Sequence, residues 1–177
     1  MNMRDLMRIV EELAEAVKKP LGKITSADKE GYPVVGGRTK WVNAFHGTAG
    51  SITHELIPHG GFVWATLSPE HASSYAVSDR AYWKGGDNPA VLLFRINIAG
   101  FLIITGNGRE IREVDGEDWR TGMTPYDIVH ELSLPGILFK KVYDTVDDER
   151  FNRAVNLVAV ADTSRIQPLF NQPSVSG

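Results

Sequence analysis

The apolar positions near the N-terminus follow the repeat of a helix. They recur at steps of three and four residues, at Leu6, Ile9, Val10, Leu13 and Val17. This spacing puts them on one face of a helix that Asn2 can cap and that ends at Pro20. Residues 21–40 are rich in glycine, lysine and turn formers, which is typical of a connection. We therefore predict an N-terminal helix and linker over residues 1–40 and a main domain over residues 41–177.

From about residue 41 onward, the apolar positions come in short runs separated by glycine or proline. Runs of this length with many β-branched residues are typical of strands. The pattern predicts strands at Trp41–His46, Phe62–Thr66, Ala90–Ile98, Phe101–Thr105, Gly136–Tyr143 and Ala154–Val160, with a further short strand at Tyr32–Val35. Gly100 splits two of these runs, which suggests paired or consecutive buried strands.

Two short helices are predicted among the strands. Ser68-Pro69-Glu70 supplies a capping hydroxyl, a proline at the first helical position and an acid in the first turn, so a helix should run over Pro69–Val77. A second helix is predicted at Pro125–Leu132. The regular alternation of strand and helix that builds a doubly wound sheet is absent, so the predicted fold class is α+β.

Composition and charge narrow the chemistry. The 177 residues include no cysteine, which excludes disulfides, a thiolate nucleophile and cysteine-ligated zinc, and favours a reducing compartment. A formal net charge of −3 disfavours nucleic acid as a partner. No stretch approaches the roughly 20 apolar residues of a membrane span, and the N-terminus carries acids where the apolar core of a signal peptide would sit. We expect a cytoplasmic protein with no membrane partner.

The histidines do not predict a metal site. His54 and His59 share a glycine-bounded loop, but no carboxylate has metal-ligand spacing to them. His71 lies near the start of its helix and is predicted to be a capping or surface residue, and His130 is predicted to lie on a helix surface. The chain also lacks a nucleophile elbow, a phosphate-binding loop and a zinc-protease motif.

Residues 45–76 concentrate the candidate chemistry. His46 ends a predicted strand and is followed by Gly47 and Thr48, so an imidazole, a backbone open to close approach and a hydroxyl meet at one place. The helix of this segment presents Tyr75 among small residues, where its ring offers a flat surface to a planar ring. The strand before that helix delivers Trp64, Ala65 and Thr66. These residues indicate a site for a ligand with an aromatic ring and hydroxyls.

A carboxylate follows the last residue of a predicted strand. Asp144 comes directly after Tyr143 and begins an acidic run with Asp147, Asp148 and Glu149. Such a run is usually a solvated turn. A carboxylate at a strand end, however, is held by a rigid element and can face a site.

These segments resemble the motifs of the ADP-ribosyltransferase-like family, in the His-Tyr-Glu branch that includes diphtheria-type toxins, poly(ADP-ribose) polymerases and many phage and bacterial effectors. Phe45-His46-Gly47-Thr48 is similar to the first motif of the family, and Trp64-Ala65-Thr66 with Tyr75-Ala76 is similar to the second. The third motif resembles Gly136-Ile137-Leu138-Phe139, which leads to Asp144, with a closing segment at residues 161–166. The resemblance covers residues 41–169.

The chain departs from the family pattern at two positions. Asp144 stands where the family usually has glutamate, which leaves Asp147 and Glu149 open as alternatives for the catalytic carboxylate. Trp64 or Val63 replaces the first tyrosine of the second motif.

The resemblance implies an ADP-ribosyltransferase-like fold of two packed, mostly antiparallel sheets with short peripheral helices. It also implies NAD as the substrate, no metal, and a catalytic set of His46, Tyr75 and Asp144. His46 would bind the adenosine-side ribose, Tyr75 would stack on the nicotinamide, and Asp144 would stabilise the positive charge that develops on the other ribose. Further NAD-binding residues would be Gly47, Thr48, Trp64, Ala65 and Thr66.

By the same resemblance, the expected activity is that of a mono-ADP-ribosyltransferase. It would transfer ADP-ribose from NAD to a macromolecule, a protein, as a phage or bacterial effector in its own or a host cytoplasm. One alternative is an NAD glycohydrolase, in which water is the acceptor. Another is a non-catalytic module of the same fold that binds a partner protein through Trp83 and Trp119.

Overall fold

The computed structural model describes residues 2–4, 7, 31–48, 60–77, 90–116, 122–146 and 149–168. Of the predicted N-terminal helix, the described residues Met3, Arg4 and Met7 are helical, and the rest lies outside the described part of the chain. His54, His59, Trp83, Trp119 and Asp147 also lie outside it.

The described residues form an α+β fold with few helices. In chain order, its elements are β1 (Trp41–Thr48), β2 (Val63–Thr66), α2 (Pro69–Ala76), β3 (Ala90–Asn97), β4 (Leu102–Glu110), α4 (Ile111–Val114), α5 (Pro125–Glu131), β5 (Gly136–Tyr143), β6 (Thr145–Val146), β7 (Glu149–Arg150), β8 (Val155–Val160), the 3-10 helix η2 (Thr163–Arg165) and β9 (Ile166–Pro168). No helix among them has the length and hydropathy that a membrane crossing requires.

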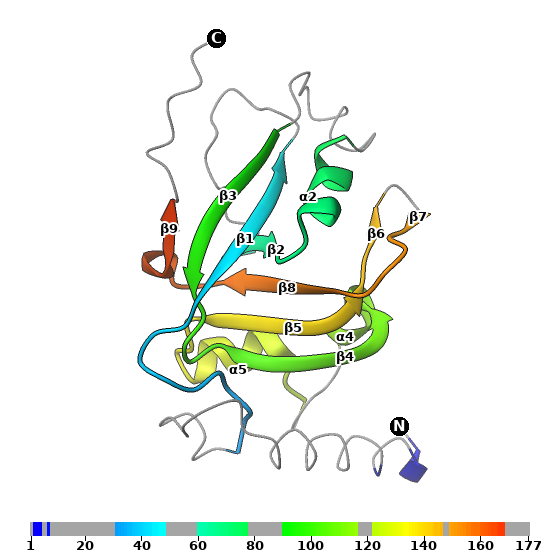
Figure 1. Ribbon diagram of the computed structural model, residues 1–177. Helices are drawn as coiled ribbons and strands as arrows, with labels where there is room; N and C mark the ends of the chain where they lie inside the picture. Colours follow the sequence, from blue (N-terminus) through cyan, green and yellow to red (C-terminus); the bar gives the residue numbers. More distant parts are fainter. Residues whose placement is uncertain are drawn as a thin grey trace.

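The main strands join in one mixed sheet of seven, in the order β4-β5-β8-β2-β1-β3-β9, and β6 pairs with β7 in a separate ribbon. β4 and β5 are parallel, whereas the other pairs in this described sheet are antiparallel. The family resemblance implied two packed, mostly antiparallel sheets, and this prediction is wrong for the described residues, whose main strands form one sheet. β1 and β2 connect the two halves through one register pair, Phe45 with Thr66. In Figure 1, β1 and β3 stand nearly upright while β8, β5 and β4 lie across them.

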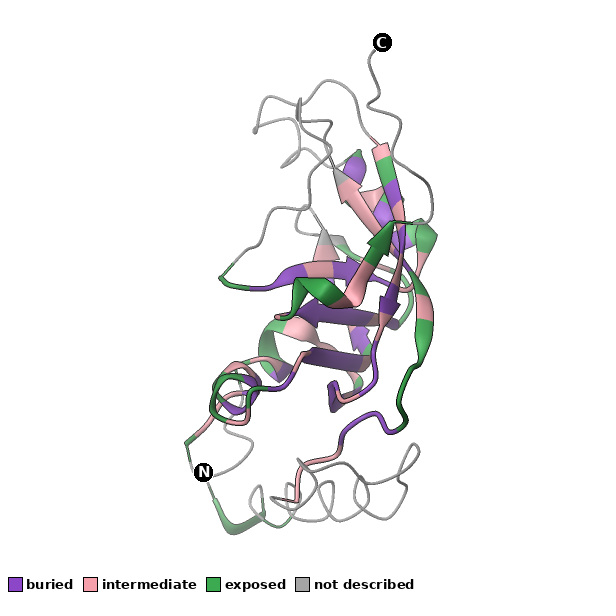
Figure 2. Ribbon diagram, turned by 90° about the vertical axis from the view of Figure 1, so that its left-hand side faces the viewer, coloured by how far each residue is buried: buried purple, intermediate pink, exposed green. Residues whose placement is uncertain are grey.

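Two apolar clusters lie on opposite faces of the sheet. The inner cluster joins the two halves, because it combines residues of β1 and β3 with residues of β5 and β8: Ala44, Leu92, Phe94, Ile96, Leu138, Val158 and Val160. The outer cluster lies between the sheet and helices α4 and α5: Ile137, Phe139, Leu157, Ala159, Val114, Ile128 and Val129. The central strands are accordingly buried along most of their length (Figure 2). Burial on both faces explains why β5 and β8 have nearly continuous apolar sequences.

Most predicted elements are confirmed, with shifted ends. β5 has the predicted bounds, and α2 and α5 begin at Pro69 and Pro125 as the capping signals indicated. β4 continues to Glu110, five residues beyond its predicted end. The predicted strand Tyr32–Val35 is reduced to a single bridge between Val34 and Leu102. β3 and β4 are consecutive but not neighbours in the sheet.

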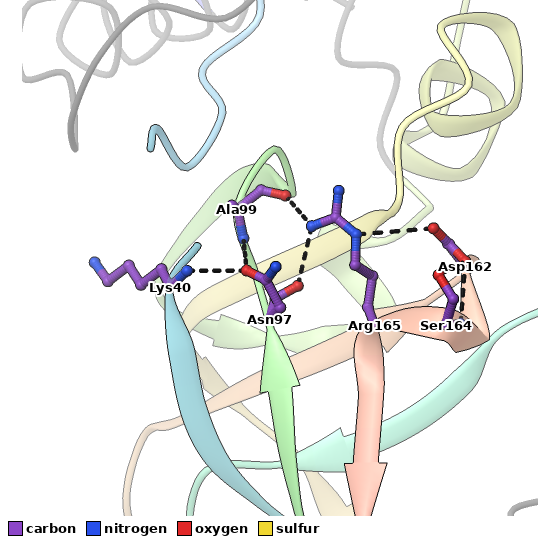
Figure 3. A network of polar contacts seen from close by, with 6 residues as sticks. All are labelled: Lys40, Asn97, Ala99, Asp162, Ser164 and Arg165. Atoms are coloured by element: carbon purple, nitrogen blue, oxygen red, sulfur yellow. Dashed lines mark hydrogen bonds and ion pairs between the residues drawn. The ribbon is translucent and has the colours of Figure 1, made fainter. Parts of the chain in front are cut away.

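A polar network fixes the closing segment of the chain to the turn after β3 (Figure 3). Arg165 donates through Nη1 to the carbonyl oxygens of Ala99, at 2.7 Å, and Asn97, at 3.3 Å. The Asn97 side-chain oxygen accepts from the backbone N–H groups of Lys40 and Ala99. Asp162 caps η2 and lies 3.7 Å from Nε of Arg165. These contacts secure β9 at the edge of the sheet.

Candidate functional site

The local sequence sets the position of helix α2. The Ser68 hydroxyl accepts a hydrogen bond from the backbone N–H of His71 at 3.2 Å, and Pro69 occupies the first turn. The Thr66 hydroxyl in turn accepts from the backbone N–H of Ser68 at 3.1 Å. Residues four apart on a helix share a face, so His71 and Tyr75 project from α2 in the same direction.

Tyr75 meets the carboxylate of Asp144, which is 69 residues further along the chain. The phenol hydroxyl donates to Oδ2 of Asp144 at 2.5 Å. Tyr75 is 40% exposed, whereas Asp144 is only 8% exposed. The second and third sequence motifs therefore meet through a short hydrogen bond to a buried carboxylate.

His71 belongs to the same group of side chains, so its prediction as a capping or surface residue is wrong. Its backbone N–H is capped, but its side chain is buried, with Nε2 3.1 Å from Oδ2 of Asp144. The imidazole also contacts the rings of Tyr75 and Phe151, with centroids 5.1 and 5.0 Å away. The one signal for this position in the sequence is the spacing of four residues between His71 and Tyr75.

A one-residue bulge in β5 decides which face Asp144 reaches. Phe139 pairs with Leu157 and Val142 with Val155, so β5 has one more residue than β8 between these pairs. Lys141 has a φ of 53° within this stretch. Phe139 and Val142 consequently face the same outer cluster, although they are three residues apart. Two residues after Val142, Asp144 reaches the side chains of α2.

The chain after Asp144 is held by its own contacts. Thr145–Val146 and Glu149–Arg150 form the β6–β7 ribbon, so this stretch is a hairpin. Nε of Arg150 lies 2.9 Å from a Glu110 carboxylate oxygen, and its guanidinium lies 3.6 Å above the Tyr143 ring. At the end of the hairpin, Phe151 donates its N–H to the carbonyl of Asp144 at 2.8 Å. The hairpin thereby brings the Phe151 ring against His71.

His46 lies where β1 and β2 separate. Its Nδ1 is 2.8 Å from the carbonyl oxygen of Trp64. A carbonyl only accepts, so Nδ1 carries the proton. Burial lowers the pKa of His46 below its usual 6.5, and the bond to Trp64 opposes this in part. The neutral ring therefore has an unprotonated Nε2, which is a hydrogen-bond acceptor for a hydroxyl.

The lowered pKa makes folding depend on His46 below neutral pH. As pH falls below the ordinary histidine value of about 6.5, the unfolded state takes up the proton first. The free energy of unfolding should thus be highest above that pH and decrease as pH falls towards the pKa of the folded state. His46→Asn keeps an N–H donor and removes this titration. Between about pH 7.5 and about pH 5, we expect the free energy of unfolding, measured by urea titration, to fall less in the variant than in the wild type. Equal losses in both proteins would contradict the expectation.

Gly47 and Thr48 complete β1 beside α2. A Cβ built on Gly47 would lie 1.9 Å from the carbonyl oxygen of Ala72 and 2.9 Å from the nitrogen of Ala76. Glycine is therefore required here by the helix that carries Tyr75. Thr48 is the last residue of β1 and pairs with Ala90.

The β2 residues have mainly structural contacts. Trp64 is stacked on Phe139, with ring centroids 5.7 Å apart and planes at 8°, and it meets Tyr126 edge-on. These contacts place the indole in the outer cluster, and no described contact joins it to Tyr75. Ala65 is buried in the inner cluster, and the buried Thr66 hydroxyl holds the start of α2.

The structure therefore brings together Tyr75, Asp144 and the unpredicted His71, with Gly47 against the same helix. Glu149, one of the alternative carboxylates, lies in β7 and pairs with Val146. The described residues contain no group of three or more His, Asp or Glu side chains that could hold a metal ion. Comparison with protein-family models, curated proteins and solved structures finds no match to this chain.

Proposed function

We propose that this protein is a mono-ADP-ribosyltransferase that cleaves the bond between nicotinamide and ribose in NAD and transfers ADP-ribose to a protein. The contact between Tyr75 and Asp144 is the main support. The contact joins two motifs that are far apart in the sequence. It combines the two groups that this chemistry needs, a partly exposed aromatic ring and a buried carboxylate.

The residues present fit NAD by their hydrogen-bonding character. The Tyr75 ring is partly exposed and can stack on a planar cation while its hydroxyl holds Asp144. Nε2 of His46 can accept a hydrogen bond from a ribose hydroxyl. The backbone of Gly47 lies beside α2, next to the turn that carries Tyr75.

Loss of nicotinamide leaves positive charge on the ribose, as in the transition state of glycoside hydrolysis. A fixed carboxylate near that carbon stabilises the charge without reorganisation, and more strongly where water is excluded. Asp144 meets these requirements, because it is buried, accepts a hydrogen bond from the Tyr75 hydroxyl and lies 3.1 Å from Nε2 of His71. Its first role is electrostatic, and its second is to accept a proton from the acceptor.

The direct test is incubation of the purified protein with NAD labelled in the adenosine part, alone and with a protein extract. Release of nicotinamide with labelling of a protein is the expected result. Release without labelling would identify an NAD glycohydrolase. Thermal melting with NAD separates binding from chemistry, because a ligand at a hundred times its Kd adds about 2.7 kcal/mol to stability. If NAD shifts no melting curve and no nicotinamide is released, the proposal is wrong, and the remaining candidate is the non-catalytic module that binds a partner protein.

A further inference from the structure

We propose that His71 is a positioning residue for Asp144, and this inference rests on the proposed function. His71 is 1% exposed, so a substrate has no access to its side chain. It acts through Asp144, whose Oδ2 lies 3.1 Å from its Nε2. The sequence motifs that point to NAD chemistry do not include this residue.

Two polar groups lie close to the same oxygen of the carboxylate. The Tyr75 hydroxyl lies 2.5 Å from Oδ2 of Asp144, and Nε2 of His71 lies 3.1 Å from the same atom. Among the described residues, both of these contacts are to Oδ2 and neither is to Oδ1. Holding one oxygen from two directions prevents the carboxylate from turning, and it leaves Oδ1 for the ribose hydroxyl and the developing charge.

The imidazole is itself held in place. The rings of Tyr75 and Phe151 both contact it, and the hairpin after Asp144 supplies the second of these rings. His71 is 1% and Asp144 8% exposed, so the attraction between the imidazole N–H and the carboxylate is stronger than it would be in water.

The hydrogen bonding of His71 argues against a purely structural role. The Nε2–H bond is not aimed closely at Oδ2, so the contact is an electrostatic one at short range rather than a well-aligned hydrogen bond. Nδ1 is buried with no hydrogen-bond partner among the described residues. A buried polar group without partners destabilises the fold, and an apolar side chain of similar size would avoid that cost. Catalytic contacts that are loose without substrate often tighten when it binds.

The test compares His71→Leu, which removes the N–H, with His71→Gln, which can place an N–H near the same point. For nicotinamide release from NAD, we expect His71→Leu to lower kcat by about 10-fold to 100-fold with little change in KM. His71→Gln should keep most of the wild-type kcat. The matched control is His130→Leu on α5, where the side chain is exposed and contacts the edge of Phe62. Wild-type kcat is expected for this control.

The outcomes separate this inference from the proposed function. If wild-type protein releases no nicotinamide, the proposed function fails and the role of His71 fails with it. If the wild type is active and a folded His71→Leu keeps its kcat, His71 alone loses its role. Equal impairment of the Gln and Leu variants, or a change confined to KM, would also overturn the inference.

A measurement without turnover covers the case in which His71→Leu does not fold. In protein with 15N-labelled histidine, the ring proton of His71 should give an NMR signal that the 15N shifts place on Nε2, and this proton should exchange slowly because the side chain is buried. Asp144→Asn should move this signal upfield. A proton found on Nδ1 alone, or a signal unchanged in Asp144→Asn, would overturn the inference.

Discussion

Replacing Asp144 with asparagine should lower kcat for nicotinamide release by about 10²-fold to 10³-fold, the usual cost of removing one electrostatic stabiliser. Asparagine has nearly the same shape, and its side-chain oxygen can still accept from the Tyr75 hydroxyl. The substitution therefore removes the negative charge that the proposed mechanism requires and preserves most of the packing. Steady-state kinetics and a melting curve on the same preparation measure the two effects separately.

The chain offers a matched control for Asp144→Asn. Asp115 also accepts a short hydrogen bond from a tyrosine hydroxyl, from Tyr126 at 2.6 Å, but this pair joins α4 and α5 beside the outer cluster. Asp115→Asn should leave kcat unchanged. If Asp144→Asn is folded and fully active, Asp144 has no catalytic role, and Asp147 or Glu149 becomes the candidate.

Gly47→Ala should lower the free energy of unfolding by about 3 kcal/mol, at the upper end of the cost of overpacking. The new methyl group would lie 1.9 Å from the carbonyl oxygen of Ala72, and this atom belongs to the helix backbone rather than to a flexible side chain. Either β1 or α2 would have to move. For a chain of this size we expect a Tm lower by about 6 to 12 °C. Thermal and urea denaturation both test this.

Gly116→Ala provides the control for Gly47→Ala. Its nearest neighbour to a new Cβ would be the carbonyl oxygen of Arg112 at 3.5 Å, which is ordinary van der Waals contact. This variant should differ little in stability from the wild type. A Tm of Gly47→Ala equal to that of Gly116→Ala would show that β1 and α2 can separate without cost.

Much of the fold is present in local sequence signals. Ser68-Pro69-Glu70 predicts the start of α2 because capping and proline act within one turn of chain. The apolar run Gly136–Tyr143 predicts β5 because burial on both faces needs no polar alternation. These signals depend on neighbours in the sequence, so no knowledge of the tertiary structure is needed to read them.

Other features depend on contacts between distant segments. β4 extends beyond its predicted end because it pairs with β5 again after a shift in register. The glycines of this segment do not by themselves indicate that pairing. The joining of two expected sheets into one depends on a single pair between β1 and β2. His71 looked like a surface residue because its partners Asp144 and Phe151 are more than a helix length away in the sequence.

Periodicity, capping and motif order are enough to specify the fold class, most elements and the choice of Tyr75 and Asp144 as candidate residues. The contact between the two side chains depends on the folded chain, in which β5 has an extra residue shortly before Asp144. The folded chain likewise brings His71 to them and gives Gly47 its role in helix packing. Local signals miss such contacts because the face and the neighbours of a side chain depend on register and packing, and a slip of one residue moves the side chain to the other face of the sheet.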